Sequence, residues 1–184
     1  YSLLETACKS NNIYLLRTRS TECPILSLKT DMGFVKKVVK NKTLRYYHNY
    51  FAKKEGFKVL HLQENDEIEE YLSAFFNQHI DRWGEKGTPS LFLRQENKDF
   101  YLELLHTMSG KKWIIFTAML AGGSPVAFHF GFLYKNRFFY YKPSFDMARA
   151  KHSPGKVLLK ELLDFSIRNK LDEFDFLAGA EAYK

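Results

Sequence analysis

The feature that most constrains the fold is the pattern of residues 113–184, which predicts three strands, a loop, one helix and a last strand. The first strand, 113–120, is almost entirely apolar, as in a strand buried on both faces. Short turns separate it from strands at 125–134 and 137–142. Three consecutive strands joined by short turns form an antiparallel meander.

The second strand of this meander has two unlike faces, because side chains alternate along a strand. One face carries large apolar side chains and is expected to belong to the core. The other face consists of Ala127, His129 and Gly131, so a neighbouring element is expected to cover it closely. His129 is the one titratable group on that face, and the unperturbed pKa of histidine, about 6.5, suits proton transfer at neutral pH.

The joint between the meander and the helix is Lys151-His-Ser-Pro-Gly-Lys156. Ser153 is a favourable N-cap, and Pro154 suits the first helical position. Lys156 falls at the third position, where a cation opposes the helix dipole unless an anion sits on the helix N-terminus. Gly155 would let the backbone approach such an anion. Two interpretations stay open, an anion-binding joint or an ordinary capped helix with a solvated lysine.

The order of these segments carries a family resemblance. The segments are Pro125-Val-Ala-Phe-His129, Tyr140-Tyr-Lys-Pro-Ser-Phe-Asp146, Ser153-Pro-Gly155 with the Leu-rich helix, Phe174-Asp175-Phe176, Gly179-x-Glu181-x-Tyr183-Lys184 and Phe76-x-x-His79-x-x-Arg82-Trp83. Over residues 65–184 they resemble the GNAT acyltransferase fold. More narrowly, they resemble the acetyltransferase domain of cellulose-biosynthesis (CelD-like) acyltransferases, related to Fem-type peptidyltransferases. The resemblance implies an α/β (α+β) domain with a mixed, mostly antiparallel central sheet flanked by helices.

One part of the chain departs from the family pattern. The usual GNAT pyrophosphate loop is Arg/Gln-x-x-Gly-x-Gly/Ala. With Gly155 as the last glycine, Ser153 takes the middle-glycine position and Ala150 the Arg/Gln position, between Arg149 and Lys151. The resemblance implies acyl-CoA as the donor, with no metal, while this departure keeps aminoacyl-tRNA, the donor of Fem-type enzymes, as an alternative.

The resemblance also implies direct acyl transfer to an amine through a tetrahedral oxyanion. Such a site needs a base, donors for the oxyanion and an acid for the leaving group. His129 is the first choice of base, with Asp146 and Glu181 as rivals, and Tyr183 is expected to protonate the leaving group. Backbone N–H groups of strand 137–142 would hold the oxyanion. Asp146 could equally be a loop residue that caps local N–H groups.

Binding roles follow from the same resemblance. His79 lies on an apolar helical stripe, where a histidine is more often a core residue with a satisfied hydrogen bond than a catalyst. The expected donor-binding residues are Arg149, Lys151, Ser153, Gly155 and Lys156, and the expected substrate-binding residues are His79, Arg82, Tyr141 and Lys142.

The net charge of +7 is concentrated in one segment. Residues 29–58 contain nine Lys and Arg against two acidic residues, and the rest of the chain is balanced. Aromatic side chains such as Tyr46, Tyr47 and Tyr50 are interleaved with them. A segment of this kind suits RNA, an anionic membrane surface or a phosphorylated carrier. A solvated helix face is the alternative.

Length and composition set the remaining bounds. A chain of 184 residues predicts one domain with a sizeable core. The chain starts at Tyr1 rather than Met, so we expect a piece of a longer protein, with a basic N-terminal part (1–64) before the part that carries the resemblance (65–184). Without a signal peptide, an apolar span or a paired-cysteine pattern, a cytoplasmic location is expected. The sequence leaves the oligomeric state open.

Several enzyme classes lack their motifs in this sequence. There is no Gly-x-Ser-x-Gly elbow, no Walker loop and no histidine spacing typical of a metal site. The sequence therefore predicts an N-acyltransferase that acts from acyl-CoA on an amine of a cell-envelope or polysaccharide-related acceptor. A Fem-type aminoacyl-tRNA-dependent transferase and a non-catalytic GNAT-like binding domain remain the alternatives.

Overall fold

The protein is described from a computed structural model. The structure describes residues 2–15, 22–31, 33, 35, 37, 40–85 and 87–178. Six strands form one sheet in the order β1-β6-β5-β4-β3-β2, and only the β5–β6 pair is parallel. The strands are β1 (Ile25–Ser27), β2 (Lys58–Leu62), β3 (Ile114–Ala121), β4 (Ser124–Tyr134), β5 (Arg137–Phe145) and β6 (Glu173–Asp175). The mixed, mostly antiparallel sheet expected from the sequence is confirmed.

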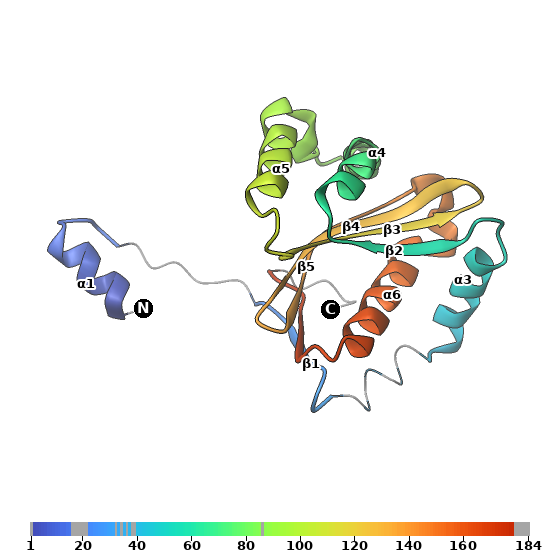
Figure 1. Ribbon diagram of the computed structural model, residues 1–184, viewed down its shortest axis with the longest axis horizontal. Helices are drawn as coiled ribbons and strands as arrows, with labels where there is room; N and C mark the ends of the chain where they lie inside the picture. The colour runs from blue at the N-terminus through green and yellow to red at the C-terminus, as the bar shows by residue number, and fades with distance from the viewer. Residues whose placement is uncertain are drawn as a thin grey trace.

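Helices lie on both faces of this sheet (Figure 1). The α-helices are α1 (Ser2–Ser10), α3 (Lys42–Ala52), α4 (Asn65–Gly84), α5 (Gln95–Thr107) and α6 (Pro154–Arg168). Two short 3-10 helices are η1 (Leu91–Leu93) and η2 (Met147–His152). Helices α4 and α5 cover one face, α3 and α6 lie on the other, and α1 stands away from the sheet.

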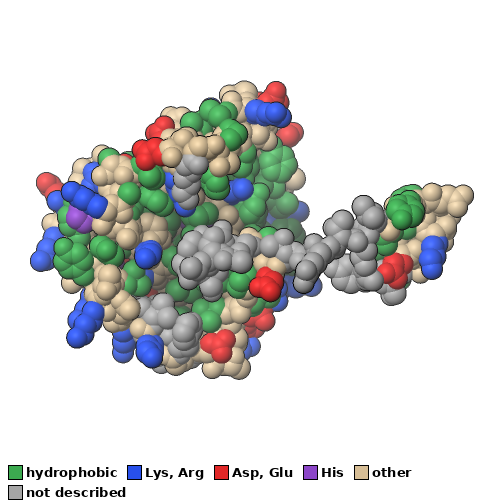
Figure 2. Space-filling view, turned by 180° about the vertical axis from the view of Figure 1, so that it is seen from behind, with side chains coloured by type: hydrophobic (Ala, Val, Ile, Leu, Met, Phe, Trp, Pro, Cys, Tyr) green, Lys and Arg blue, Asp and Glu red, His purple; other side chains and the backbone are tan. Residues whose placement is uncertain are grey.

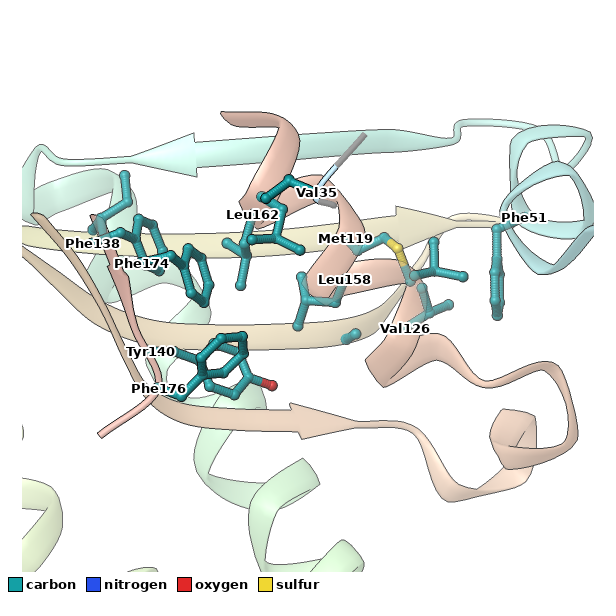
Figure 3. Close-up of a cluster of buried hydrophobic side chains, with 14 of the residues drawn as sticks. Val35, Phe51, Met119, Val126, Phe138, Tyr140, Leu158, Leu162, Phe174 and Phe176 are labelled. Atoms are coloured by element: carbon teal, nitrogen blue, oxygen red, sulfur yellow. The ribbon is translucent and has the colours of Figure 1, made fainter. Parts of the chain in front are cut away.

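Each face of the sheet has its own hydrophobic core. On the α6 side, Leu158 and Leu162 point toward the strands, and the rings of Phe138 and Phe174 stack at 4.8 Å (Figure 3). On the other side, Phe75 of α4 packs among aromatic rings of β3, β4 and η1. Strand β3 is buried along nearly its whole length between the two cores, as its apolar sequence predicts.

An irregularity in the β4–β5 pairing shapes the middle of the sheet. Phe130 pairs with Lys142 and Phe132 pairs with Phe139, so Tyr140 and Tyr141 of β5 lie opposite the single residue Gly131 of β4. This is a β-bulge, which bends a strand and changes the direction of its side chains. Tyr140 joins the core beneath α6, whereas the Tyr141 ring faces Tyr101 of α5.

The bulge also marks where β5 and β6 separate. Strand β6 pairs with β5 only from Arg137 to Phe139, and residues 142–145 of β5, beyond the bulge, pair with β4 alone. The chain then passes through η2 and enters α6, whose first turn lies beside this half of β5. The candidate functional site lies beside this half of β5.

Candidate active site

The N-terminus of α6 has the position that the sequence predicts. Ser153 is the N-cap and Pro154 the first helical residue. The hydroxyl of Ser153 makes no capping hydrogen bond, and its backbone is left-handed, with φ 50° and ψ 51°. The backbone carbonyl of Ser153 accepts from the N–H groups of Lys156 and Val157. The positive end of the helix dipole therefore faces the opening beside β5.

A pocket of about 280 Å³ lies at this N-terminus. It brings together three of the expected donor-binding residues with one residue expected to bind the acceptor substrate, Arg82 of α4. The lining residues are Arg82, Tyr140, Pro143, Phe145, Ala150, Ser153, Gly155, Lys156 and Leu159. Two cationic side chains and a helix N-terminus thus converge on one cavity, a combination that suits an anion.

Arg82 is held firmly at the wall of this pocket. Its Nη1 donates a hydrogen bond of 2.6 Å to the carbonyl oxygen of Pro143, and its guanidinium carbon lies 4.4 Å above the centre of the Phe145 ring. A guanidinium stacked on an aromatic ring in this way gains cation–π stabilisation. The last turn of α4 is thereby fastened to β5, and the charge of Arg82 is placed across from Lys156.

Gly155 makes room for the same ring. A Cβ at this position would lie 3.1 Å from Cδ1 of Phe145, closer than ordinary van der Waals contact. The glycine is therefore needed for the close approach of α6 and β5 as well as for access to the helix N-terminus.

The other basic residues of the joint lie outside the pocket lining. Arg149 donates through Nε to Oδ2 of Asp146 at 3.0 Å, and Lys151 is exposed. Asp146 also accepts the N–H of Ala148 on Oδ1 at 2.9 Å and is the N-cap of η2. Both carboxylate oxygens are thus engaged locally, which matches the capping role that the sequence left open for Asp146.

His129 lies at the centre of the sheet and is fully buried. Its Nε2 accepts the backbone N–H of Tyr141 at 3.1 Å, and its ring stacks on Tyr140 at 4.9 Å. Burial lowers its pKa to about 3, with a smaller effect from His61. Because His129 is neutral and enclosed, a role as the hydrogen-bond acceptor that supports the bulge fits it better than the role of general base expected from the sequence.

Gly131 is required for the position of the His129 ring, a role that sequence reasoning did not assign to it. A Cβ on Gly131 would collide with the His129 ring and with the carbonyl oxygen of Phe139. The absence of a side chain at Gly131 therefore leaves the space that the His129 imidazole occupies.

The other residues expected to bind substrate face the opposite side of the sheet. His79 is buried, with Nδ1 2.8 Å from the Ser90 hydroxyl oxygen, as expected of a core histidine with a satisfied hydrogen bond. Its pKa is lowered to about 4 by burial first and then by Lys142 and Arg82. The ammonium of Lys142 lies 5.0 Å over the Tyr141 ring. Of these four, only Arg82 reaches the pocket.

Two expected catalytic residues, Glu181 and Tyr183, lie outside the described residues. Within the described part of the chain, no group of three or more His, Cys, Asp and Glu side chains is arranged to hold a metal ion. The same part contains no helix with the length and apolar character to cross a bilayer. Sequence reasoning assigned no side-chain role to Tyr140, Pro143 or Phe145, although all three fall in a segment that carries the family resemblance.

The fold and the pocket together define an acyltransferase-type domain, in which a parallel strand pair separates beside a helix N-terminus. Comparison with known families agrees. Residues 39–184 match the family described as "Acetyltransferase (GNAT) domain", and this match covers most of the chain. The protein belongs to this family. The match starts in the basic segment, earlier than the residue 65 expected from the sequence. No curated protein matches the chain.

Solved structures share the fold at low sequence identity. FemX aligns with a TM-score of 0.63 at 8% identity, over 91% of this chain and 56% of that one. The C-terminal domain of a putative lysylphosphatidylglycerol synthetase from Agrobacterium fabrum aligns with a TM-score of 0.59 at 13% identity, over 89% of this chain and 48% of that one. L-PGS from Bacillus licheniformis aligns with a TM-score of 0.56 at 16% identity, over 88% of this chain and 46% of that one. The chain thus spans about half the length of these relatives.

Proposed function

We propose that the protein is an N-acyltransferase that moves an acyl group from acyl-CoA to an amine of a cell-envelope or polysaccharide-related acceptor. The observation that carries this proposal is the pocket between the separated half of β5 and the N-terminus of α6, which Arg82 and Lys156 both line. Membership of the acetyltransferase family supports acyl transfer as the reaction class.

The pocket residues suit the donor in complementary ways. The dipole of α6 and the charges of Lys156 and Arg82 would bind the pyrophosphate. The apolar side chains of Tyr140, Phe145 and Leu159 would contact the uncharged arm that carries the thioester. In the reaction, the amine nitrogen attacks the carbonyl carbon, the C–S bond breaks, and the proton that the amine loses balances the one that the thiolate gains.

The choice of acceptor rests on similarity. The sequence resembles CelD-like acyltransferases, and the structural neighbours include FemX, L-PGS and the C-terminal domain of a protein named as a putative lysylphosphatidylglycerol synthetase. The last of these names contains phosphatidylglycerol, a membrane phospholipid, which supports an acceptor in the cell envelope. We therefore place the acceptor amine on an envelope or polysaccharide precursor, and we expect the chain to work as part of a longer protein.

A second candidate is aminoacyl transfer from tRNA. The exposed face of α3 favours it, because Lys42, Arg45 and Lys53 recur there and no carboxylate lies in the first turn. A third is a binding domain without transfer activity, for which the donor pocket would stay empty in every assay.

Calorimetric titration with acetyl-CoA tests the proposed donor. We expect a dissociation constant on the order of micromolar for the unmodified protein. Binding should be lost in Gly155→Trp, whose side chain would occupy the pocket. Gly84→Trp is the matched control, because Gly84 is helical, has open space around its Cβ position and does not line this pocket. Release of free thiol in the presence of sugar amines, lysine or amino lipids would then identify the acceptor class.

Either of two results would contradict the proposal. One is a folded protein that does not bind acetyl-CoA, which would make aminoacyl-tRNA the next donor to test. The other is acetyl-CoA binding that Gly155→Trp leaves intact, which would place the donor elsewhere.

A further inference from the structure

The pocket at α6 is small for the donor it is proposed to bind. Its volume of about 280 Å³ is at the lower limit of ligand pockets, which range from roughly 300 to 1,000 Å³. Both acyl-CoA and the 3′ end of an aminoacyl-tRNA carry a phosphorylated adenosine beyond the reacting group. This part of either donor must extend onto a neighbouring surface.

We propose that the exposed face of α3, together with His152, forms a subsite for the phosphorylated nucleotide of the donor. The inference rests on the proposed donor site and names a part of it that lies on a different helix. A second pocket, of about 360 Å³, is lined there by Tyr46, Asn49, Tyr50, Lys53 and Lys54.

The two pockets are neighbours across one aromatic pair. The rings of Tyr50 and His152 stack at 3.5 Å with an interplanar angle of 15°. Tyr50 lines the α3 pocket, and His152 directly precedes Ser153, which lines the pocket at α6. A ligand with one phosphate group near Lys156 can therefore continue over this pair onto α3.

Charge distinguishes the α3 pocket from the other available extension. A third cavity, of about 680 Å³, also borders the pocket at α6, because Phe145 lines both. Its lining includes Asp81, Glu85 and Asp146 but neither lysine nor arginine. Carboxylates repel phosphate, whereas the α3 pocket is lined by two lysines and no carboxylate. The anionic end of the donor is therefore directed toward α3.

The α3 pocket has the chemistry of a nucleotide site. The Tyr46 side chain is 66% exposed, and the ammonium of Lys54 lies 4.9 Å over the Tyr50 ring. Aromatic rings stack on bases, and lysines neutralise phosphates. Figure 2 shows Lys and Arg side chains along the left edge of the molecule, which is the side of α3 in that view.

His152 offers a spectroscopic report on this surface. Its pKa is lowered, by desolvation first and then by the positive charges of Lys151 and Lys54. The ring of Tyr50 stacks on that of His152. A bound phosphate would offset the two lysine charges, so the pKa of His152 should rise on nucleotide binding.

The experiment uses adenosine 3′,5′-bisphosphate, acetyl-CoA and a short RNA ending in CCA as probes of the full chain. We expect each bound probe to raise the NMR-monitored pKa of His152. The combined variant Lys53→Gln and Lys54→Gln should weaken binding of adenosine 3′,5′-bisphosphate by about five- to tenfold, a modest effect because both lysines are exposed. The combined variant Lys111→Gln and Lys112→Gln is the matched control. These two adjacent lysines are exposed and precede the start of β3, whereas α3 lies near the end of β3 that pairs with Lys58.

The outcomes separate this inference from the proposed function. Loss of acetyl-CoA binding in Gly155→Trp, with no effect of the α3 variant or of removing the 3′-phosphate of CoA, would overturn the subsite and leave the donor site intact. Nucleotide or RNA binding that depends on Lys53 and Lys54 without any acetyl-CoA binding would support the subsite and overturn acyl-CoA as the donor. Preference for acetyl-CoA over the CCA RNA, or the reverse, identifies which donor supplies the nucleotide.

Discussion

At the scale of single residues, His129 shows how a buried polar group can shape a neighbouring strand. Its Nε2 takes the N–H of Tyr141, which the bulge has removed from the regular ladder. Because a buried donor without a partner costs about 1–3 kcal/mol, this hydrogen bond stabilises the bulge and with it the separation of β5 from β6. The imidazole thus acts on the pocket through the backbone.

Substitution of His129 should separate this role from that of a general base. His129→Leu leaves the Tyr141 N–H without an acceptor, so the free energy of unfolding should fall by about 1–3 kcal/mol and exchange of the Tyr141 amide should accelerate. In His129→Gln a side-chain oxygen can take the place of Nε2, so slow exchange and acetyl-CoA binding should largely return. Amide exchange measured by NMR is the direct readout. Loss of transfer in His129→Gln with normal Tyr141 exchange and donor binding would instead make His129 the base.

The buried histidines also predict how stability depends on pH. The folded protein keeps His61, His79 and His129 neutral, with pKa values lowered to about 4, about 4 and about 3. The unfolded chain binds protons at these residues near pH 6.5, so protonation favours unfolding as the pH falls from about 6.5 toward 4. Each histidine then contributes a loss of up to about 1.4 kcal/mol per pH unit.

Urea denaturation at pH 7, 6 and 5 would measure this slope. The loss between pH 6 and 5 should be smaller in His129→Gln, because one of the three histidines that take up a proton on unfolding is removed. An unchanged slope in that variant would mean that His129 is not neutral in the folded protein.

At the scale of elements, the periodic segments were predictable from sequence and the contacts between them were not. The apolar run of β3 and the leucines of α6 fix their own strand and helix, because each pattern matches the period of one structure. Arg82 was expected to bind substrate. It lines the pocket at α6, where its position depends on a hydrogen bond to Pro143, which is distant in sequence. The β-bulge likewise depends on pairing that the sequence of β5 does not encode alone.

The start of α6 gives a prediction at this scale. Ser153 occupies the position of the middle glycine in the usual loop of the family, and its φ of 50° is a conformation that costs an L-residue roughly 1–2 kcal/mol. Because its hydroxyl makes no capping bond, Ser153→Gly should raise the free energy of unfolding by about 0.5–1 kcal/mol after the added flexibility of the unfolded chain is included. Acetyl-CoA binding should be kept or improved.

Chemical denaturation of Ser153→Gly and Ser153→Ala provides the comparison. Alanine keeps the Cβ and removes only the hydroxyl, so it should give no gain. Equal stabilisation by both substitutions would show that the hydroxyl, and not the left-handed backbone, is what costs stability at this joint.

At the scale of the whole molecule, the N-terminal segment divides into a part outside the fold and a part within it. Helix α1 stands apart from the sheet in Figure 1, and Leu3 and Leu4 are 86% and 53% exposed. Further along the chain, β1 pairs with β6, and Leu28 is buried in the core beneath α6. Strand β1, which forms the edge of the sheet beside β6, therefore comes from residues that precede the family match, which begins at residue 39.

Two truncations test where the folding unit begins. Removal of residues 1–15 should change the free energy of unfolding by less than about 0.5 kcal/mol, because most of the large apolar side chains described in this stretch, such as Leu3 and Tyr14, are exposed. Removal of residues 1–28 also deletes β1 and Leu28, whose backbone N–H donates to Asp172 at 2.9 Å. We expect this loss to cost about 3 kcal/mol or more, from an uncovered core and an unpaired β6. It should also weaken acetyl-CoA binding, since β6 borders the opening beside β5. Equal stability and equal donor binding of the two truncated proteins, measured by urea denaturation and calorimetry, would instead restrict the folding unit to the family match.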